Sequence, residues 1–216
     1  MYTELRDELS ALSVALIAIS KTHPPERIQA MYAQGQRAFG ENRPQEMLGK
    51  YTTLPQDIQW HFIGHLQTNK VRLIAPFVQL IHSVDSEKLL REIDKQAAQA
   101  GRVLDCLLQF HIAREDTKFG FDEAAARTLL ASPAYQTLPH VRICGVMGMA
   151  TFTDDTEQVR QEFRELHRIF ETLRRDFFAA APHFRECSMG MSGDWRIAVE
   201  EGSTMVRIGS LIFGER

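Results

Sequence analysis

The sequence lacks the features that would place the protein in a membrane or on nucleic acid. None of its 216 residues belongs to a stretch of roughly 18 consecutive apolar residues, the length that a membrane-spanning helix needs. The N-terminus lacks the basic and then apolar pattern of a secretory signal peptide. The net charge is only −3, so there is no electrostatic reason to expect a nucleic acid or an anionic membrane as partner.

Cysteine is also scarce. The three cysteines cannot all pair, and each one lies in an apolar, strand-like context: Cys106, Cys144 and Cys187. No CxxC motif is present, which argues against a zinc ribbon and against a redox-active dithiol. The sequence therefore predicts reduced thiols in the core of a cytoplasmic protein.

What the chain does contain is a regular alternation of short apolar segments and helical patterns. Eight segments have the composition of buried strands, at 15–20, 38–42, 59–64, 77–84, 104–112, 141–149, 184–191 and 205–210. Helical patterns open between them near Pro24, Pro44, Asn69, Ser86, Asp122, Asp155 and Asp194, and a further helix is expected at about 2–12.

Eight strands interleaved with helices predict an α/β fold, a single parallel (β/α)8 TIM barrel with an N-terminal helix. A doubly wound open sheet is the alternative, because alternation alone does not decide whether a sheet closes. The number eight favours the barrel. At this length it leaves no room for a second domain, so residues 1–216 are expected to form a single barrel domain.

Lys21 follows the first predicted strand directly, where a buried apolar segment ends. A lysine amine in a desolvated site loses its proton more easily and can form a Schiff base with a cofactor aldehyde. The structural alternative is a lysine that ends the strand and extends into solvent.

In a barrel of this kind, the chemistry lies on the loops that follow the strands, and the loops after the last two strands often hold a phosphate. Here those loops contain Ser192-Gly193 and Gly209-Ser210. Glycine lets backbone N–H groups approach a phosphate, although Ser-Gly-Asp is also ordinary helix-cap chemistry. Because the first and eighth strands of a closed barrel are neighbours, these residues, Arg207 and Lys21 would lie on one arc. That arrangement suits pyridoxal 5′-phosphate.

The chain also resembles the YggS/PROSC-type pyridoxal-phosphate homeostasis proteins from the first strand to the last. The matching stretches are Ile17-Ala-Ile-Ser-Lys-Thr-His-Pro24, Phe39-Gly-Glu-Asn-Arg43 with Gln45-Glu46, Trp60-His-Phe-Ile-Gly64 with Leu66-Gln-Thr-Asn-Lys70, Lys118-Phe-Gly120, Gly145-Val-Met-Gly-Met149, Ser188-Met-Gly-Met-Ser192 and Gly202-Ser-Thr-Met-Val-Arg-Ile-Gly209. The segment before Lys21 is shorter than is usual in that family, and Pro44 replaces an aliphatic residue.

The resemblance implies a barrel like the N-terminal domain of bacterial alanine racemase, with pyridoxal 5′-phosphate held as a Schiff base on Lys21. It further implies a role for each of the other site residues. Ser192, Gly209 and Ser210 would hold the phosphate, Arg207 would face the pyridine nitrogen, Asn42 would lie near the ring and Met149 beneath it.

The function expected from this resemblance is intracellular homeostasis of pyridoxal 5′-phosphate by a non-catalytic carrier that supplies apoenzymes and acts as a monomer. The alternative is a racemase like alanine racemase, which needs a second proton-transfer group. None of the four tyrosines lies at a predicted strand end: Tyr2, Tyr32, Tyr51 and Tyr135. A cofactor-free barrel isomerase or aldolase acting on a phosphorylated sugar is a third hypothesis.

Three other groups of residues carry weaker signals. His61 and His65 would lie roughly 13 Å apart on a strand, too far for one metal ion, so no metal is expected. Glu115 and Asp116 are expected in a solvated turn. Lys118 could meet an anion near the barrel mouth or lie on the surface.

Overall fold

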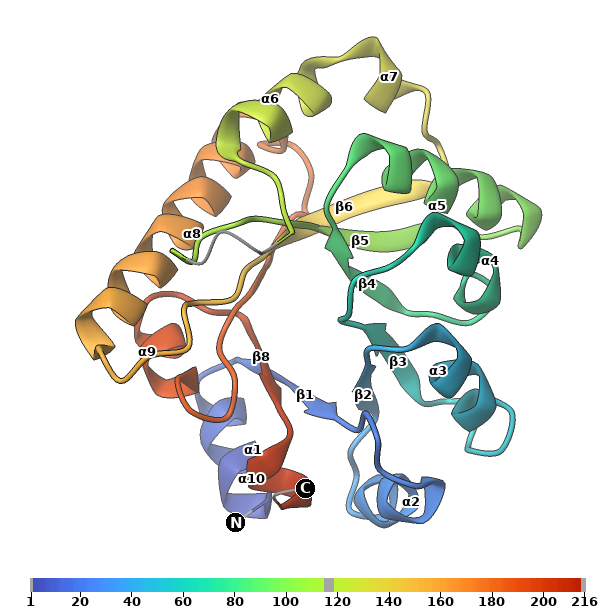
Figure 1. Cartoon of the computed structure of the whole chain (residues 1–216), viewed down its shortest axis with the longest axis vertical. Helices are drawn as coiled ribbons and strands as arrows, with labels where there is room; N and C mark the ends of the chain where they lie inside the picture. Colours follow the sequence, from blue (N-terminus) through green and yellow to red (C-terminus); the bar gives the residue numbers. More distant parts are fainter. Residues whose placement is uncertain (1, 115–118, 215–216) are drawn as a thin grey trace.

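The computed structural model describes residues 2–114 and 119–214, and the expectations for Glu115, Asp116 and Lys118 lie outside these ranges. Eight parallel strands close into a barrel in chain order, with β1 paired to both β2 and β8 (Figure 1). The strands are β1 (Ala15–Ile19), β2 (Ala38–Glu41), β3 (Gln59–Phe62), β4 (Leu80–Val84), β5 (Leu104–Gln109), β6 (Val141–Met147), β7 (Glu186–Ser188) and β8 (Met205–Ile208). The predicted barrel is confirmed, and the open doubly wound sheet is excluded.

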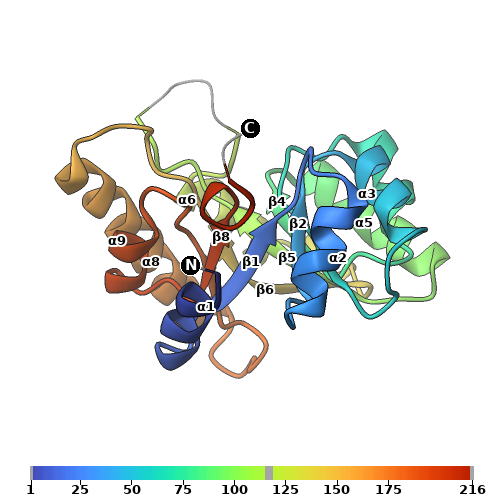
Figure 2. The same cartoon turned by 90° about the horizontal axis from the view of Figure 1, so that it is seen from below.

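Helices surround the barrel, with α2, α3 and α5 on one side and α8 and α9 on the other (Figure 2). The helices are α1 (Tyr2–Ala11), α2 (Pro25–Ala33), α3 (Pro44–Tyr51), α4 (Val71–Ile74), α5 (Glu87–Gln99), α6 (Glu123–Ala131), α7 (Pro133–Gln136), α8 (Thr156–Phe177), α9 (Trp195–Glu200) and α10 (Ser210–Phe213), with a 3₁₀ turn, η1, at Thr68–Lys70. No helix among the described residues is long and apolar enough to cross a membrane.

The helix starts follow from local chemistry. Ser86 and Asp122 precede α5 and α6, and each side chain accepts a hydrogen bond from a backbone N–H of the first turn. Proline begins α2 and α3, where a missing N–H costs nothing.

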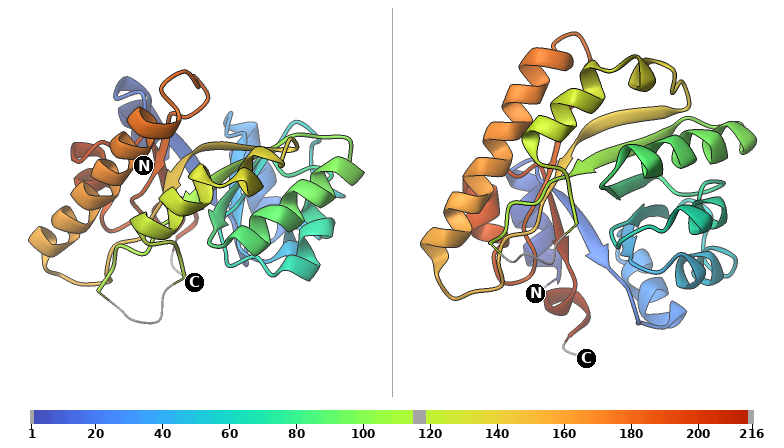
Figure 3. Two further views of the ribbon diagram at one scale, coloured as in Figure 1. Left: turned by 90° about the horizontal axis from the view of Figure 1, so that it is seen from above. Right: turned by 45° about the horizontal axis from the view of Figure 1, so that its top comes forward.

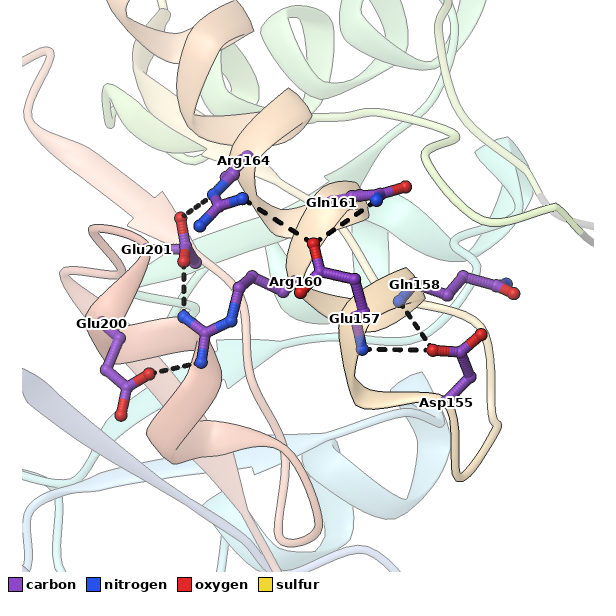
Figure 4. A network of polar contacts seen from close by, with 8 residues as sticks. All are labelled: Asp155, Glu157, Gln158, Arg160, Gln161, Arg164, Glu200 and Glu201. Atoms are coloured by element: carbon purple, nitrogen blue, oxygen red, sulfur yellow. Dashed lines mark hydrogen bonds and ion pairs between the residues drawn. The ribbon is translucent and has the colours of Figure 1, made fainter.

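The long helix α8 lies on the outside of the barrel against α6 and α9 (Figure 3). Its apolar stripe of Val159, Phe163, Leu166, Phe170 and Leu173 is buried, as the three-and-four spacing predicts. On its exposed face, Arg160 and Arg164 reach Glu200 and Glu201 at the end of α9 (Figure 4).

Side chains alternate between the inside of the barrel and the layer between barrel and helices. Ile17 and Ile19 of β1 lie in a small interior cluster, whereas Ala18 between them belongs to the large outer core. Ile17 pairs with Arg207 across the β1–β8 seam. The alternation therefore assigns Arg207 to the interior, next to β1.

Several strands are shorter than predicted. The predicted strand at 184–191 is reduced to Glu186–Ser188, and Gly190 has φ +95°, a left-handed conformation that ends the extended backbone. The predicted strand at 205–210 ends at Ile208, because Ser210 begins the short helix α10. Neither α10 nor α7 was predicted. With the shorter strands, Met149, Gly209 and Ser210 lie beyond the strand ends at the barrel mouth, whereas Arg207 remains within β8.

Candidate functional site

A cavity of about 850 Å³ opens at the carboxyl ends of the strands. Its lining includes residues from the first, second, sixth, seventh and eighth strand ends. All seven residues predicted to bind the cofactor line this cavity: Lys21, Asn42, Met149, Ser192, Arg207, Gly209 and Ser210. The structure thus brings the predicted residues together, across nearly the whole length of the chain.

Lys21 sits two residues beyond the last residue of β1 and is only partly buried. Behind it lies an ion cluster, which we call the Lys50 cluster and which consists of the buried Glu41 and Lys50 and the partly exposed Glu46. Lys50 Nζ lies 2.7 Å from Glu41 Oε1 and 2.7 Å from Glu46 Oε1. Since Phe39 and Glu41 share the outer face of β2, the cluster is behind the barrel wall rather than in the cavity.

The Lys50 cluster holds the two residues that flank Lys21. Lys50 Nζ donates to the carbonyl oxygen of Ser20 at 2.9 Å, and the Ser20 hydroxyl donates to Glu41 Oε1 at 2.6 Å. On the other side, the Thr22 N–H donates to Glu46 Oε1 at 2.6 Å. Thr22 has φ +68°, which is strained for a β-branched residue. The cluster therefore maintains an unusual backbone at the point where Lys21 turns into the cavity.

Burial and pairing act in opposite directions on the two carboxyl groups of the cluster. Burial raises the pKa of Glu41, whose second oxygen, Oε2, has no hydrogen-bond partner among the described residues. Burial also acts to raise the pKa of Glu46, but hydrogen bonds from Lys50 and from the Thr22 N–H outweigh it, so the pKa is lowered. Glu46 is thus the carboxylate that carries the charge beside Thr22.

The loops after β7 and β8 meet at one end of the cavity. The Gly209 N–H donates to Ser192 Oγ at 3.2 Å, which joins the two loops. Asp194 accepts from the Met191 N–H at 2.5 Å and closes the turn that contains Ser192 and Gly193. A Cβ added at Gly193 would meet no atom within 4 Å, so this turn leaves open space in front of its backbone. A hydroxyl and backbone N–H groups can donate hydrogen bonds to a phosphate group, and the small residues leave space for it to approach.

Arg207 forms the floor of the cavity and is almost completely buried. Its NH1 donates to the Ser188 carbonyl at 2.8 Å and to Ser188 Oγ at 2.7 Å, and its NH2 donates to the Gly148 carbonyl at 3.0 Å. Burial lowers the pKa of Arg207 to about 10, which leaves the guanidinium charged at neutral pH. A fixed positive charge therefore faces the cavity from below.

Asn42 offers an unused acceptor beside Lys21. Its Oδ1 is buried and has no hydrogen-bond partner among the described residues. A Cβ at Gly64 would lie 2.8 Å from Asn42 Cα and 2.4 Å from its carbonyl oxygen, so only glycine fits there. Together with Lys21, the hydroxyl and glycine loops and Arg207, this orphaned acceptor fits an aromatic aldehyde that carries a phosphate and a ring hydroxyl.

The sequence reasoning missed the interior polar residues. His61 Nδ1 lies 2.9 Å from His82 Nε2, and His82 Nδ1 lies 3.0 Å from Ser188 Oγ. His65 is elsewhere, 3.1 Å from Asp85 Oδ2 and stacked on Phe119. No group of three or more metal-ligating side chains occurs within residues 2–114 and 119–214. Alternation along β3, β4, β7 and β8 was the available signal, since it places His61, His82, Ser188 and Arg207 on one face.

Met189 and Met191 lie in different surroundings, although residues two apart in a regular strand share one face. Met189 is fully buried in the outer core, whereas Met191 is partly exposed and lines the cavity. The left-handed Gly190 between them breaks the alternation. None of the tyrosines at 2, 32, 51 and 135 lines the cavity.

Comparison with known proteins identifies the family. A family model described as the N-terminal domain of alanine racemase matches residues 2–216. A protein of Aquifex aeolicus named pyridoxal phosphate homeostasis protein is 43% identical over 202 residues, which cover 93% of this chain and 86% of the relative. This chain belongs to the pyridoxal phosphate homeostasis protein family. The family predicted from the motifs is confirmed.

Other members of the pyridoxal phosphate homeostasis family extend the match. The Vibrio alginolyticus protein is 37% identical over 220 residues, covering 100% of this chain and 92% of the relative. The structure of PipY from Synechococcus elongatus with PLP bound is 38% identical, with a TM-score of 0.86, and the match covers 99% of this chain and 98% of PipY. Alanine racemase of Clostridium difficile shares the fold alone, at 11% identity and a TM-score of 0.72 over 97% of this chain and 55% of the racemase.

Proposed function

We propose that the protein binds pyridoxal 5′-phosphate, holds it as a reversible Schiff base on Lys21 and takes part in intracellular homeostasis of this cofactor. The observation that carries the proposal is a single cavity in which a lysine amine, a buried guanidinium and two small-residue loops converge from opposite ends of the chain. A PipY structure with PLP bound supports it, because that protein is 38% identical over nearly the whole chain.

Each group in the cavity has a distinct task in this proposal. Lys21 provides the amine, which must lose its proton before it can attack an aldehyde. Ser192, Gly209 and Ser210 hold the phosphate through hydroxyl and backbone N–H groups. Asn42 contacts the ring substituents with its orphaned Oδ1, and Met149 packs against the ring. The cofactor itself supplies an aldehyde and, in enzymes, an electron sink.

Arg207 argues against reactions that need a long-lived carbanion, such as transamination. A protonated guanidinium facing the pyridine nitrogen disfavours protonation of that nitrogen, and this makes the cofactor a poorer electron sink. Racemisation would also need a second proton-transfer group opposite the lysine, and no tyrosine of the chain lines the cavity. Relatives named as homeostasis proteins are consistent with a non-catalytic role.

The wider biological role in this proposal has four parts. The chain works as one barrel domain and as a monomer, and it supplies its cofactor to apoenzymes that depend on pyridoxal 5′-phosphate. Three buried cysteines, none in a disulfide, support a reducing compartment such as the cytoplasm. Light scattering tests the monomer, and activation of a cofactor-free transaminase by the loaded protein tests the supply.

The decisive experiment is visible absorbance of the purified protein with added pyridoxal 5′-phosphate, followed by borohydride reduction and peptide mapping. The wild type should show the band of a lysine-bound cofactor and carry the reduced label on Lys21, whereas Lys21→Ala should lose both. Lys88→Ala is the matched control, because Lys88 is an exposed lysine on α5 outside the cavity. A wild type without the band, or a label on another lysine, would refute the proposal, and measurable racemase activity would favour the enzyme alternative.

A further inference from the structure

A continuous row of hydrogen bonds leads from the cavity floor into the barrel interior. It runs from Arg207 NH1 to Ser188 Oγ at 2.7 Å, from Ser188 Oγ to His82 Nδ1 at 3.0 Å and from His82 Nε2 to His61 Nδ1 at 2.9 Å. All four residues are at most 5% exposed. Since buried polar groups need partners, the direction of each bond can be worked out from one end.

Arg207 determines the direction, because a guanidinium has donors only. Ser188 Oγ therefore accepts from NH1, and its single hydrogen remains to be donated. Within the described residues, Ser188 Oγ has two side-chain hydrogen-bond partners, Arg207 NH1 and His82 Nδ1. If the hydroxyl donates to Nδ1, then His82 carries its proton on Nε2 and donates to His61 Nδ1. His61 in turn carries its proton on its own Nε2.

The opposite direction is less favourable. It would need His61 to donate from Nδ1 and His82 to donate from Nδ1 to Ser188 Oγ. The Ser188 hydroxyl would then accept two hydrogen bonds while its own hydrogen had no recorded acceptor in a fully buried site. Because a buried donor without an acceptor is costly, this arrangement is the minor one.

We propose that Ser188, His82 and His61 form a one-way hydrogen-bond chain in which both histidines are neutral Nε2–H tautomers, and that this chain positions the guanidinium of Arg207. The tautomers follow from the protein alone. The consequence for the cofactor rests on the proposed function: the chain keeps the charge of Arg207 directed at the pyridine nitrogen without adding a second positive charge beneath it. Ser188, His82 and His61 are positioning residues, since they act through Arg207.

Nitrogen-15 NMR of the cofactor-free protein tests the tautomers directly. With labelled histidine at pH 7, the two interior histidines should each show a protonated Nε2 and an unprotonated Nδ1. His61→Gln and His82→Gln serve to assign the two sets of signals. A protonated Nδ1 on either residue in the wild type would overturn the proposed direction, and a doubly protonated ring would overturn the neutral chain.

Ser188→Ala tests the positioning role against a closely matched control, Ser83→Ala. Ser83 is equally buried and adjoins His82, but its Oγ has no hydrogen-bond partner among the described residues. Ser188→Ala should mix the His82 tautomers, shift the absorbance band of the loaded protein and raise the dissociation constant for pyridoxal 5′-phosphate about tenfold, the size of one charge-assisted hydrogen bond. Ser83→Ala should leave all three measurements unchanged.

The two proposals fail in different ways. If the wild type binds no pyridoxal 5′-phosphate, the proposed function fails. The histidine tautomers measured by NMR still show whether the hydrogen-bond chain has the proposed direction. If the wild type binds normally and Ser188→Ala matches Ser83→Ala in both tautomers and absorbance, the positioning role is wrong while the proposed function stands.

Discussion

Two ion clusters of similar composition lie in very different surroundings in this protein. The Lys50 cluster lies between the barrel and α3, and the side chains of Glu41, Lys50 and Glu46 are 0%, 6% and 24% exposed. The cluster between α8 and α9 in Figure 4 is more open to solvent, since Arg164 and Glu157 are 58% and 63% exposed, although Glu201 is 11% exposed. Both contain short carboxylate–cation contacts, so distance alone does not separate them.

The two clusters differ in how much hydration their charged groups lose on folding. An exposed ion pair exchanges water for a partner and contributes little to stability. Lys50 and Glu41 have already lost almost all of their water, so removing one of them leaves the other buried without its partner. Such a cluster can therefore hold backbone in a strained geometry, as the Lys50 cluster does at Thr22, whereas the α8–α9 cluster only joins two helix surfaces.

The largest expected effect is that of Lys50→Met. The substitution removes the cation between two carboxyl groups, one of them fully buried, and should lower the free energy of unfolding by about 3–5 kcal/mol. Urea unfolding followed by circular dichroism measures it. Lys88→Met, at an exposed position of α5, is the control. A loss below about 1 kcal/mol would mean that the different burial of the two clusters does not govern their contributions to stability.

The second prediction compares buried and exposed titratable groups through the pH dependence of stability. Burial lowers the pKa of His61 from 6.5 to about 4, so the unfolded chain binds a proton in this range that the folded chain does not. Stability should therefore fall as the pH drops from 6.5 towards 4, by about 3 kcal/mol from this residue. The exposed arginine–carboxylate pairs contribute little to stability and should therefore add little to the slope.

The measurement is urea unfolding at a series of pH values for the wild type and His61→Gln. The variant should have a clearly shallower loss of stability between pH 6.5 and 4. His65→Gln, which replaces a more exposed histidine, is the control. Equal slopes for the wild type and His61→Gln would show that the buried histidine does not titrate as expected.

The smallest effect is expected for Arg160→Ala. Arg160 bonds Glu200 and Glu201 across α8 and α9, but Glu201 keeps Arg164 as a partner. The melting temperature should fall by less than about 3 °C, and raised ionic strength should reduce the difference further. Calorimetry measures it, and a fall as large as that of Lys50→Met would remove the distinction between the two clusters.

Much of the fold followed from local pattern. Eight apolar segments separated by helix signals predicted the barrel, and the order of strand ends predicted that Lys21, Ser192, Arg207 and Gly209 would meet. Strand lengths were less predictable. The strand at 184–191 was predicted too long, because nothing local distinguishes Gly190 in a left-handed turn from a glycine inside a strand.

Local pattern was enough to predict the strands, most of the helices, the order of the barrel and the chemical groups at its mouth, because these depend on periodicity and spacing along the chain. Only the folded chain reveals that Lys50, nine residues beyond Glu41, turns back beneath Lys21, and that His82 bridges His61 and Ser188. Such contacts depend on which side chains face one another across neighbouring or opposite strands and helices. Their partners are selected by packing and by the need to satisfy buried polar atoms, and neither is visible in local pattern.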